Sequence, residues 1–321
     1  MKRSRKKKTI GDFIWRLVFL AALVVFCYCA FQLVTIYLEY KKGTDEYSSL
    51  EQQYVTEDTI SGTTENNTPS GTGDGTRTGS DGSEATDGTS ETTGKVEGSG
   101  TAEDPYTTGE TETEIETDAE GKTTVKAYPV LKNPVDFESL KKVNEDIIGW
   151  IRVNALDISY PIAQSTNNDY YLHRTFERVD NFAGCIFMEY QNHSDFSDKN
   201  TIIYGHNMAD GSMFHSLMSY TEKSAWDYNS LIFFDTLKER HIYKIFAVFK
   251  TSANAGKGFS YHQFVDAQNE TEFNDFVTNC KNLSFYDTGI TPKYGDKIIC
   301  LSTCEYTLNN GRLVVAAVRI S

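Results

Sequence analysis

One uncharged apolar run near the N-terminus, LVFLAALVVFCYCAFQLVTIYL, constrains this chain more than any other feature. It extends from Leu17 to Leu38, and about 22 residues at about 1.5 Å of rise each suffice to cross a roughly 30 Å hydrocarbon layer. A cleaved signal peptide is the alternative, but the run exceeds a signal's apolar core and no clear small-x-small cleavage site follows. The run also lacks the amphipathic pattern of a helix packed on a core. The sequence therefore predicts an uncleaved membrane span over residues 17–38.

Basic residues gather on the N-terminal side of this run. The stretch MKRSRKKK and Arg16 precede it, whereas Lys41 and Lys42 follow it. By the positive-inside rule, residues 1–16 form a cytoplasmic tail and the C-terminal part lies outside the cell. The whole chain carries a net charge of −14 and no basic face that would neutralise phosphates, which excludes a nucleic-acid partner.

A low-complexity segment follows the apolar run. Residues 39–127 are dominated by Gly, Ser, Thr, Asp and Glu, as in SGTTENNTPSGTGDGTRTGSDGSEATDG. Hydrophobic residues are too sparse there to offset the entropy of ordering, so we expect a disordered stalk. Its root-mean-square reach is roughly 50 Å at about 5–6 Å × √n, which suits a tether between a membrane and a folded domain.

The remaining segment, residues 128–321, has the composition of a globular domain. Aromatic and β-branched residues are dense, and turn signals recur at short intervals. We expect helices over 136–144, 212–220 and 270–282, and strands over 148–153, 158–164, 184–190, 200–205, 241–251, 296–304 and 312–320. Many short strands with two or three helices predict a mostly β barrel or sandwich with inserted helices.

The cysteines predict neither a disulfide nor a metal site. Two of the six lie in the apolar run, and the others are Cys185, Cys280, Cys300 and Cys304. No pairing can be deduced, and the CxxC or Cys/His spacings of zinc sites are absent. Cys300 and Cys304 lie about 13 Å apart along one strand, too far to bridge each other. We therefore expect no metal and no cofactor.

The segment CLSTCEYTLNNGR places a cysteine, Cys304, and an arginine, Arg312, at the two ends of a short polar stretch. Alternation along KIICLSTC puts Cys300, Ser302 and Cys304 on one face. If the strands on either side of the segment pair in antiparallel fashion, Cys304 and Arg312 lie within a few ångströms of each other. The guanidinium would then favour a thiolate and donate to an oxyanion. Taken singly, each residue is better explained as a half-buried thiol or a solvated strand-edge charge.

A proton carrier completes such a site, and His206 is the first candidate among six histidines. It follows the apolar strand TIIY in NTIIYGHNMADGSMFHSL. Gly205 permits a sharp turn and a close approach, so the imidazole can reach a neighbouring strand end. It would protonate a leaving amine and later accept a proton from an incoming one. His215 ranks second, because packing on its own helix explains it equally well.

Six ordered motifs in the C-terminal part resemble those of class B sortases. They span nearly all of 136–321 and read NEDIIGWIRV, ISYPIAQSTNNDYYLHRTF, GCIFMEYQN, NTIIYGHNMADGSMFHSL, LSTCEYT and the GR pair. An N-terminal span with a basic flank also resembles this family. Two departures are visible: Cys300 stands where TLxTC usually begins with Thr, and Asn167-Asn168 stands where Asp-Asn is frequent. Neither touches Cys304, His206 or Arg312.

The resemblance implies a closed β-barrel of about eight strands, N-terminal helices and an inserted helix before the cysteine strand. It implies that Cys304 is the nucleophile, His206 the general acid and base, and Arg312 the group that holds the substrate carbonyl. Ser302, Thr303 and Asn168 would border the substrate groove. The enzyme would cleave a C-terminal sorting signal of secreted surface proteins through a thioester. It would then transfer the protein to an amine of a peptidoglycan cross-bridge at the outer face of the cell membrane.

Three other readings remain open from the sequence. A pilin-polymerising sortase would use the amine of a lysine in another surface protein. A cysteine protease of another fold would release a free carboxylate without any gain from added amine. A stalked, non-enzymatic adhesin would need no reactive thiol.

Overall fold

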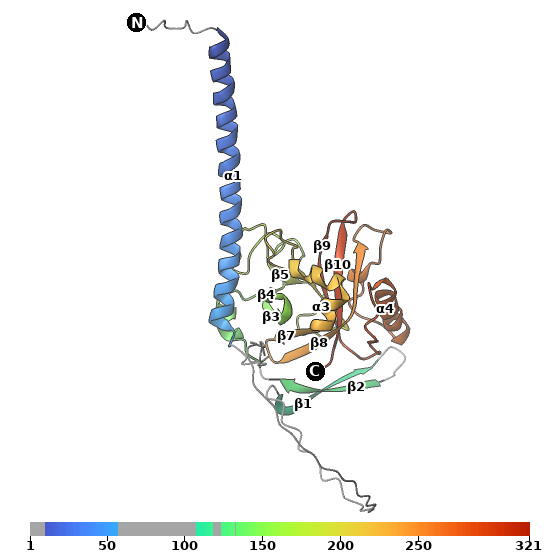
Figure 1. Cartoon of the computed structure of the whole chain (residues 1–321). Coiled ribbons are helices and arrows are strands. Elements are labelled where there is room, and N and C mark those ends of the chain that lie inside the picture. Colours follow the sequence, from blue (N-terminus) through green and yellow to red (C-terminus); the bar gives the residue numbers. More distant parts are fainter. Residues whose placement is uncertain (1–9, 57–106, 118–122, 132) are drawn as a thin grey trace, which may run out of the picture. The chain divides into compact units, whose positions relative to one another are not determined.

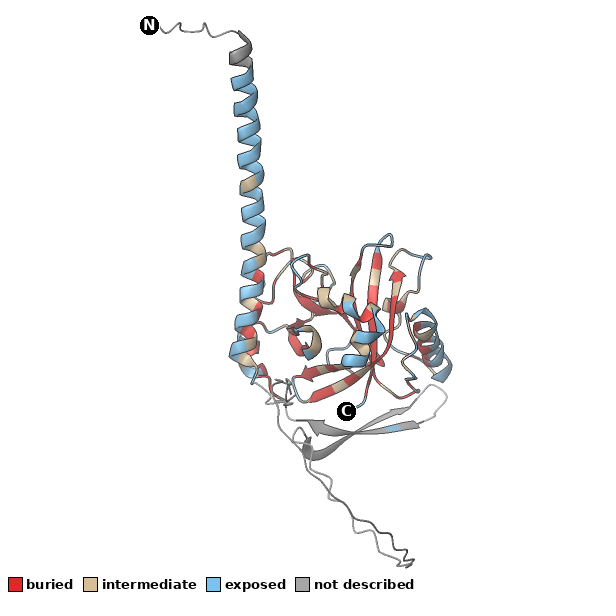
Figure 2. Ribbon diagram, in the orientation of Figure 1, coloured by how far each residue is buried: buried red, intermediate tan, exposed pale blue. Residues whose placement is uncertain are grey.

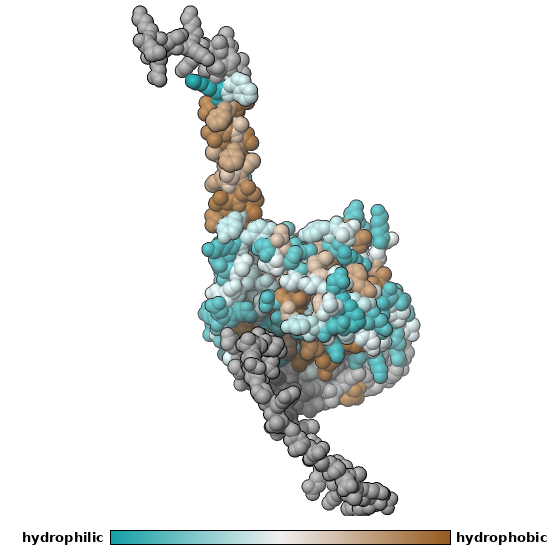
Figure 3. All heavy atoms as spheres, in the orientation of Figure 1, coloured by the Kyte–Doolittle hydropathy of each residue, from teal (hydrophilic) through white to brown (hydrophobic). Residues whose placement is uncertain are grey.

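A single long helix begins the structure, a computed structural model that describes residues 10–56, 107–117, 123–131 and 133–321. Helix α1 (Ile10–Tyr54) contains 45 residues, and most of its side chains from Trp15 to Leu38 are exposed (Figures 2 and 3). Among the described residues, it is the one helix long and apolar enough to cross a membrane. This is compatible with an anchor or with a signal sequence.

The helix continues past the expected end of the apolar run. Tyr47 and Leu50 are buried, and Tyr40 and Tyr54 pack on the same core. These four residues recur at helical spacing, so one face of α1 is apolar beyond residue 38. The expectation of disorder from residue 39 onward is therefore wrong for residues 39–54, where tertiary packing stabilises the helix.

A β-hairpin occupies the other end of the expected stalk. Strands β1 (Thr107–Thr117) and β2 (Thr123–Leu131) pair in antiparallel fashion, and Leu131 bridges to Arg240. Thr recurs along both strands, and β-branched residues favour extended backbone. The expected disorder is thus also wrong for these two segments. Residues 57–106 of the expected stalk lie outside the described residues.

The globular part is a closed barrel of eight strands (Figure 1). Its strand order is β8-β10-β9-β6-β5-β4-β3-β7, and pairing of β7 with β8 closes the ring. The strands are β3 (Ile147–Val153), β4 (Ile158–Ala163), β5 (Ile186–Met188), β6 (Asn200–Tyr204), β7 (Leu231–Thr236), β8 (Arg240–Ser252), β9 (Ile298–Glu305) and β10 (Gly311–Arg319). The expected mostly β fold with a closed barrel is confirmed.

Short helices surround the barrel. They are α2 (Phe137–Val143), η1 (Asn154–Leu156), η2 (His215–Thr221), α3 (Lys223–Tyr228), η3 (Tyr261–Gln263) and α4 (Glu270–Leu283). The expected N-terminal helix and the helix inserted before the cysteine strand correspond to α2 and α4. The expected helix over 212–220 is shorter and of the tighter 3₁₀ type, and β7 had no counterpart in the sequence analysis.

Two apolar clusters lie on opposite faces of the barrel wall. Alternate residues such as Ile203, Leu301 and Val315 belong to the cluster that includes the barrel interior. Ile202, Cys300 and Val314, one position away on the same strands, pack instead with α4 through Phe273, Phe276, Val277 and Cys280. The face shared by Cys300, Ser302 and Cys304 is therefore the outer face of the barrel, as alternation predicts.

Candidate active site

The register of three neighbouring strands brings the candidate catalytic residues together. Cys304 on β9 is the direct cross-strand partner of Arg312 on β10. Strand β6 runs parallel to β9, with Tyr204 opposite Ser302, so His206 follows its strand at the level of Cys304. All three residues line one pocket of about 210 Å³. The juxtaposition expected from the sequence is thus present, whereas the roles of the three residues stay predictions.

Gly205 lets the chain turn beside the pocket. Its N–H donates to Ser302 O at 3.1 Å. A Cβ at this position would lie 2.4 Å from Ile186 Cδ1 and 2.7 Å from the Phe214 ring. Only a residue without a side chain fits so close an approach, and the approach places His206 against β9.

The imidazole of His206 is half-buried and oriented by the backbone. Its Nε2 lies 2.8 Å from Leu172 O, and because a carbonyl oxygen only accepts, Nε2 carries the hydrogen. Nδ1 is then the nitrogen that can take up a proton. Burial lowers the pKa of His206 below its usual value, the Leu172 contact partly opposes this, and the nearby His173 and Arg312 lower it further. Neutral imidazole is therefore the favoured resting state.

The turn between β9 and β10 holds Arg312. Its Nη1 donates to Asn310 Oδ1 at 3.1 Å and to Gly311 O at 2.8 Å. Both contacts use Nη1, and a guanidinium has five N–H groups in a planar fork. The groups on Nη2 and Nε are thus available for an oxygen bound beside Cys304.

A buried carboxylate next to Cys304 organises the same turn. Glu305 accepts from Lys250 Nζ at 2.9 Å and from the N–H groups of Thr307 and Leu308. Burial alone would raise the pKa of Glu305, but the hydrogen bonds from Thr307 and Lys250 outweigh it and lower the pKa to about 2. Glu305 is therefore ionised near neutral pH and ties the turn to β8.

Asn207 connects the loop after His206 to the cysteine strand. Its Nδ2 donates to Cys304 O at 2.8 Å, and its Oδ1 lies 2.7 Å from His215 Nδ1. His215, the second candidate for the proton carrier, thus supports Asn207 rather than lining the pocket.

The three proposed groove residues all line the pocket. The Ser302 hydroxyl lies 2.6 Å from the Tyr261 hydroxyl, whose pKa burial raises to about 12. Thr303 is buried, and its Oγ1 has no hydrogen-bond partner among the described residues. Asn168 donates through Nδ2 to Glu189 Oε2 at 2.8 Å, and its Oδ1 accepts from the Tyr190 N–H.

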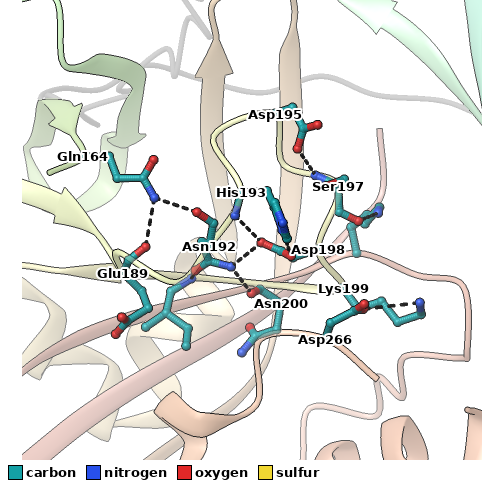
Figure 4. A network of polar contacts seen from close by, with 12 residues as sticks. Gln164, Glu189, Asn192, His193, Asp195, Ser197, Asp198, Lys199, Asn200 and Asp266 are labelled. Atoms are coloured by element: carbon teal, nitrogen blue, oxygen red, sulfur yellow. Dashed lines mark hydrogen bonds and ion pairs between the residues drawn. The ribbon is translucent and has the colours of Figure 1, made fainter. Parts of the chain in front are cut away.

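A polar network behind the pocket wall holds Asn168 and Tyr204 in place. Buried Glu189 accepts from Asn168 and from the Tyr204 hydroxyl, the latter at 2.8 Å. Figure 4 shows how this network continues: Gln164 donates to the carbonyl oxygens of Glu189 and Asn192, and Asn192 donates to Asp198. These buried polar groups satisfy one another, which keeps the loop between β5 and β6 rigid.

The chemistry available at this site centres on a thiol. Among the described residues, no group of three or more His, Cys, Asp or Glu is arranged to hold a metal ion. Cys185, Cys280 and Cys300 are free and buried, and burial raises the pKa of each thiol well above its usual value. Cys304 is partly exposed, so it is the thiol of the barrel that a substrate can reach.

Comparison with known proteins points to one family. Residues 151–320 match the sortase domain family. Sortase B of Listeria monocytogenes is 37% identical over 182 residues, which cover 56% of this chain and 72% of that protein. A Staphylococcus aureus sortase B–substrate complex has 33% identity and a TM-score of 0.53, covering 58% of this chain and 84% of the other. A sortase B complexed with triglycine has 33% identity and a TM-score of 0.53, covering 58% and 85%.

Proposed function

The chain belongs to the sortase family and is a sortase B-type cysteine transpeptidase, and from this premise we propose that it joins surface proteins to the cell wall. It would cleave a C-terminal sorting signal through a thioester at Cys304 and pass the acyl group to a cell-wall amine. One observation carries the proposal: Cys304, His206 and Arg312 come from three strand ends and line one outward-facing pocket.

The residues divide the acylation step between them. The Cys304 thiolate attacks a backbone carbonyl carbon of the signal, and the carbonyl oxygen becomes an oxyanion. The guanidinium of Arg312, anchored through Nη1, donates to that oxyanion. The proton of the Cys304 thiol passes to Nδ1 of neutral His206 as the thiolate forms. The imidazolium then gives this proton to the leaving amine as the C–N bond breaks, which leaves a thioester and the released C-terminal fragment.

Deacylation reverses these proton movements. An incoming amine attacks the thioester carbon, and neutral His206 accepts its proton at Nδ1. The C–S bond then breaks and a new amide forms, and the Cys304 sulfur takes the proton back from His206. Burial of His206 favours the neutral imidazole that this step needs, and the Leu172 carbonyl keeps Nε2 protonated.

The substrates follow from the family and from the pocket. We propose that Ser302, Thr303 and Asn168 contact the sorting signal, because all three line the pocket. A related sortase B has been solved with triglycine, which supports a peptidoglycan cross-bridge amine as the acceptor. We assign no sorting sequence, because the loops between residues 253 and 295 carry no transferable code.

We further propose the location of the enzyme. The apolar part of α1 would anchor it in the cell membrane, with residues 1–16 in the cytoplasm and residues 128–321 as the extracellular catalytic domain. The basic flank MKRSRKKK supports this orientation. Residues 17–38 would form the span.

A peptide-library transpeptidation assay tests the reaction. We expect the full chain to form an amide product that rises with added amine, and we expect mass spectrometry to trap an acyl group on Cys304. Cys304→Ala should abolish both signals, whereas Cys300→Ala, on the same face of the same strand, should retain them. Arg312→Lys should lose most activity, because an ammonium lacks the planar two-donor geometry. Product from Cys304→Ala, or a free carboxylate with no gain from amine, would overturn the proposal.

A further inference from the structure

Helix α1 passes from its apolar part to its docked part without a spacer. The apolar run ends at Leu38, and the next residue already contacts the barrel part, since Glu39 O accepts from Asn181 Nδ2 at 3.2 Å. The Tyr40 ring then packs edge-on against Phe182 at 4.4 Å between centroids. Figure 3 shows the brown apolar surface of α1 continuing to the point where the globular part begins.

The length of this junction sets the height of the globular part above the bilayer. At about 1.5 Å of rise per residue, residues 39–44 lie within roughly 2–9 Å of Leu38 along the helix axis. The headgroup layer on each side of a bilayer is about 5–8 Å thick. Groups that lie beside residues 39–44 therefore lie at the level of the lipid headgroups.

The end of the barrel that holds the pocket lies at this level. The side of α1 from Tyr40 to Glu51 lines a cavity of about 310 Å³ together with residues 210–213, which belong to the loop after His206. The same loop is joined to the β9–β10 turn, because the Tyr306 hydroxyl donates to Asn207 O at 3.2 Å. The cysteine strand thus ends near the membrane-proximal part of α1.

The opposite end of the barrel lies at the far end of α1. Tyr54 O accepts from the Asp136 N–H at 2.8 Å, and Val55 bridges to Val135 just before α2. Asn133 Nδ2 donates to Thr236 O at 2.7 Å, at the end of β7 that pairs with the start of β8. The other end of β8 pairs with the start of β10 through Ser252↔Gly311. One end of the barrel therefore faces the bilayer, and the other faces away.

The β9–β10 turn, residues 306–310, presents two large side chains to solvent at this level. Tyr306 is 77% exposed and Leu308 is 42% exposed. Partial burial raises the pKa of Tyr306, and the nearby thiol of Cys304 and phenol of Tyr40 raise it further, in keeping with a position between the pocket and α1. A tyrosine and a leucine suit the interfacial layer, where one end of a side chain is apolar and the other wet.

We infer that the pocket end of the barrel rests on the phospholipid bilayer from which α1 emerges, with Tyr306 and Leu308 of the β9–β10 turn inserted among the headgroups. This inference rests on the proposed membrane anchor. It goes beyond that anchor, because an anchor joined to the barrel by a flexible tether would leave the barrel free to rotate. Cys304 then works at the membrane surface. A substrate whose C-terminal segment is still held in the bilayer can reach the Cys304 thiol while that segment stays in the bilayer.

Fluorine NMR of the full chain in lipid nanodiscs tests this orientation. Trifluoromethyl-phenylalanine is placed at Leu308 in one sample and at Tyr228, 84% exposed on α3, in a matched control. The register Ser252↔Gly311 and Leu231↔Lys244 puts the control roughly 20 Å further along the barrel. A gadolinium-chelating lipid then reports how near each probe is to the bilayer.

A wrong orientation and a wrong membrane anchor give different results in this experiment. We expect relaxation by the gadolinium lipid to be at least about tenfold stronger at 308 than at 228, given that separation along the strands. Equal relaxation at both sites, with the chain retained in the nanodiscs, would overturn the orientation and leave the anchor standing. A chain that does not co-elute with nanodiscs would overturn both the anchor and the orientation.

Discussion

At the scale of single residues, the environment of each group decides which thiol and which imidazole can react. Four cysteines belong to the barrel, and three of them are buried with raised thiol pKa values. Cys304 differs because its side chain lies on the outer face of β9, is partly exposed and lies directly opposite Arg312. His206 differs from His215 because its imidazole lines the pocket itself.

The pKa of His206 is open to direct measurement. We expect an NMR titration of its ring to give a midpoint below 6.5, because burial disfavours the imidazolium. Arg312→Gln should raise this midpoint, since the variant removes a nearby positive charge. His193 serves as the internal control, because its hydrogen bond to Asp198 and the charge of that carboxylate raise its pKa above 6.5. A midpoint for His206 above that of His193 would contradict the burial argument.

The proposed catalytic residues were easier to predict from the sequence than the residues that contact them. Cys304, His206 and Arg312 sit at recognisable strand ends, so pattern and resemblance both pointed to them. Glu189, Tyr261 and the Leu172 carbonyl had no such signal. Their contacts cross 15 or more positions of sequence, and a backbone carbonyl is present at every residue. Only the folded arrangement identifies such partners.

At the scale of elements, the turn after β6 depends on the missing side chain of Gly205. We expect Gly205→Ala to destabilise the fold by about 1–3 kcal/mol, because its Cβ would overlap Ile186 and Phe214. Displacement of His206 should also lower activity. Thermal unfolding and the transpeptidation assay measure the two effects. Gly211→Asn is the control, since a Cβ there meets nothing within 4 Å and Asn tolerates positive φ. Equal stability of the two variants would show that the turn can relax.

The β9–β10 turn should depend on pH through Glu305. Its folded pKa is lowered to about 2 from a usual 4.5, so its stabilising effect is full above about pH 4.5 and is lost as the pH falls toward 2. We expect Glu305→Gln to reduce stability by about 1–3 kcal/mol near neutral pH, because buried bonds from Lys250 and the turn are weakened. Thermal melts across this range should show the two proteins converging in acid. A constant difference from pH 7 to pH 2 would contradict this assignment.

Most barrel strands were predictable from the sequence pattern, and the elements that were not predicted have physical causes. Alternation and β-branched residues marked β3, β4 and β8 to within a few residues. Strand β7 reads LIFFDT, a short apolar run without alternation, so neither strand nor helix periodicity is legible. Residues 39–54 and the β1–β2 hairpin were missed because composition suggested disorder there. Their order depends on packing and pairing that local sequence does not reveal.

At the scale of the whole molecule, docking of α1 joins the proposed membrane span to the catalytic domain. The Tyr47 hydroxyl donates to Gly184 O at 2.7 Å, and its ring packs edge-on against Tyr160 at 5.3 Å. The Tyr160 hydroxyl in turn accepts from the Met213 N–H, in the loop after His206. A side chain of α1 thus contacts the loop after His206 through one intermediate residue.

Truncation of Tyr47 should therefore loosen both the helix and the loop. We expect Tyr47→Ala to cost about 3–5 kcal/mol where α1 is docked, because a buried ring and its hydrogen bond are both lost. In the full chain, hydrogen exchange should speed up over residues 39–54 and over 207–213. Proteases should cut α1 on the C-terminal side of residue 38. Tyr28→Ala, on the exposed apolar part of the same helix, should change neither.

Tyr47→Phe separates the two contributions to this docking. It keeps the ring and removes only the bond to Gly184, which should cost about 1 kcal/mol and leave the loop protected from exchange. If Tyr47→Ala exchanged no faster than Tyr28→Ala, α1 would not be docked in solution. The catalytic domain would then move freely on its tether, and the height of Cys304 above the bilayer would no longer be set by the helix.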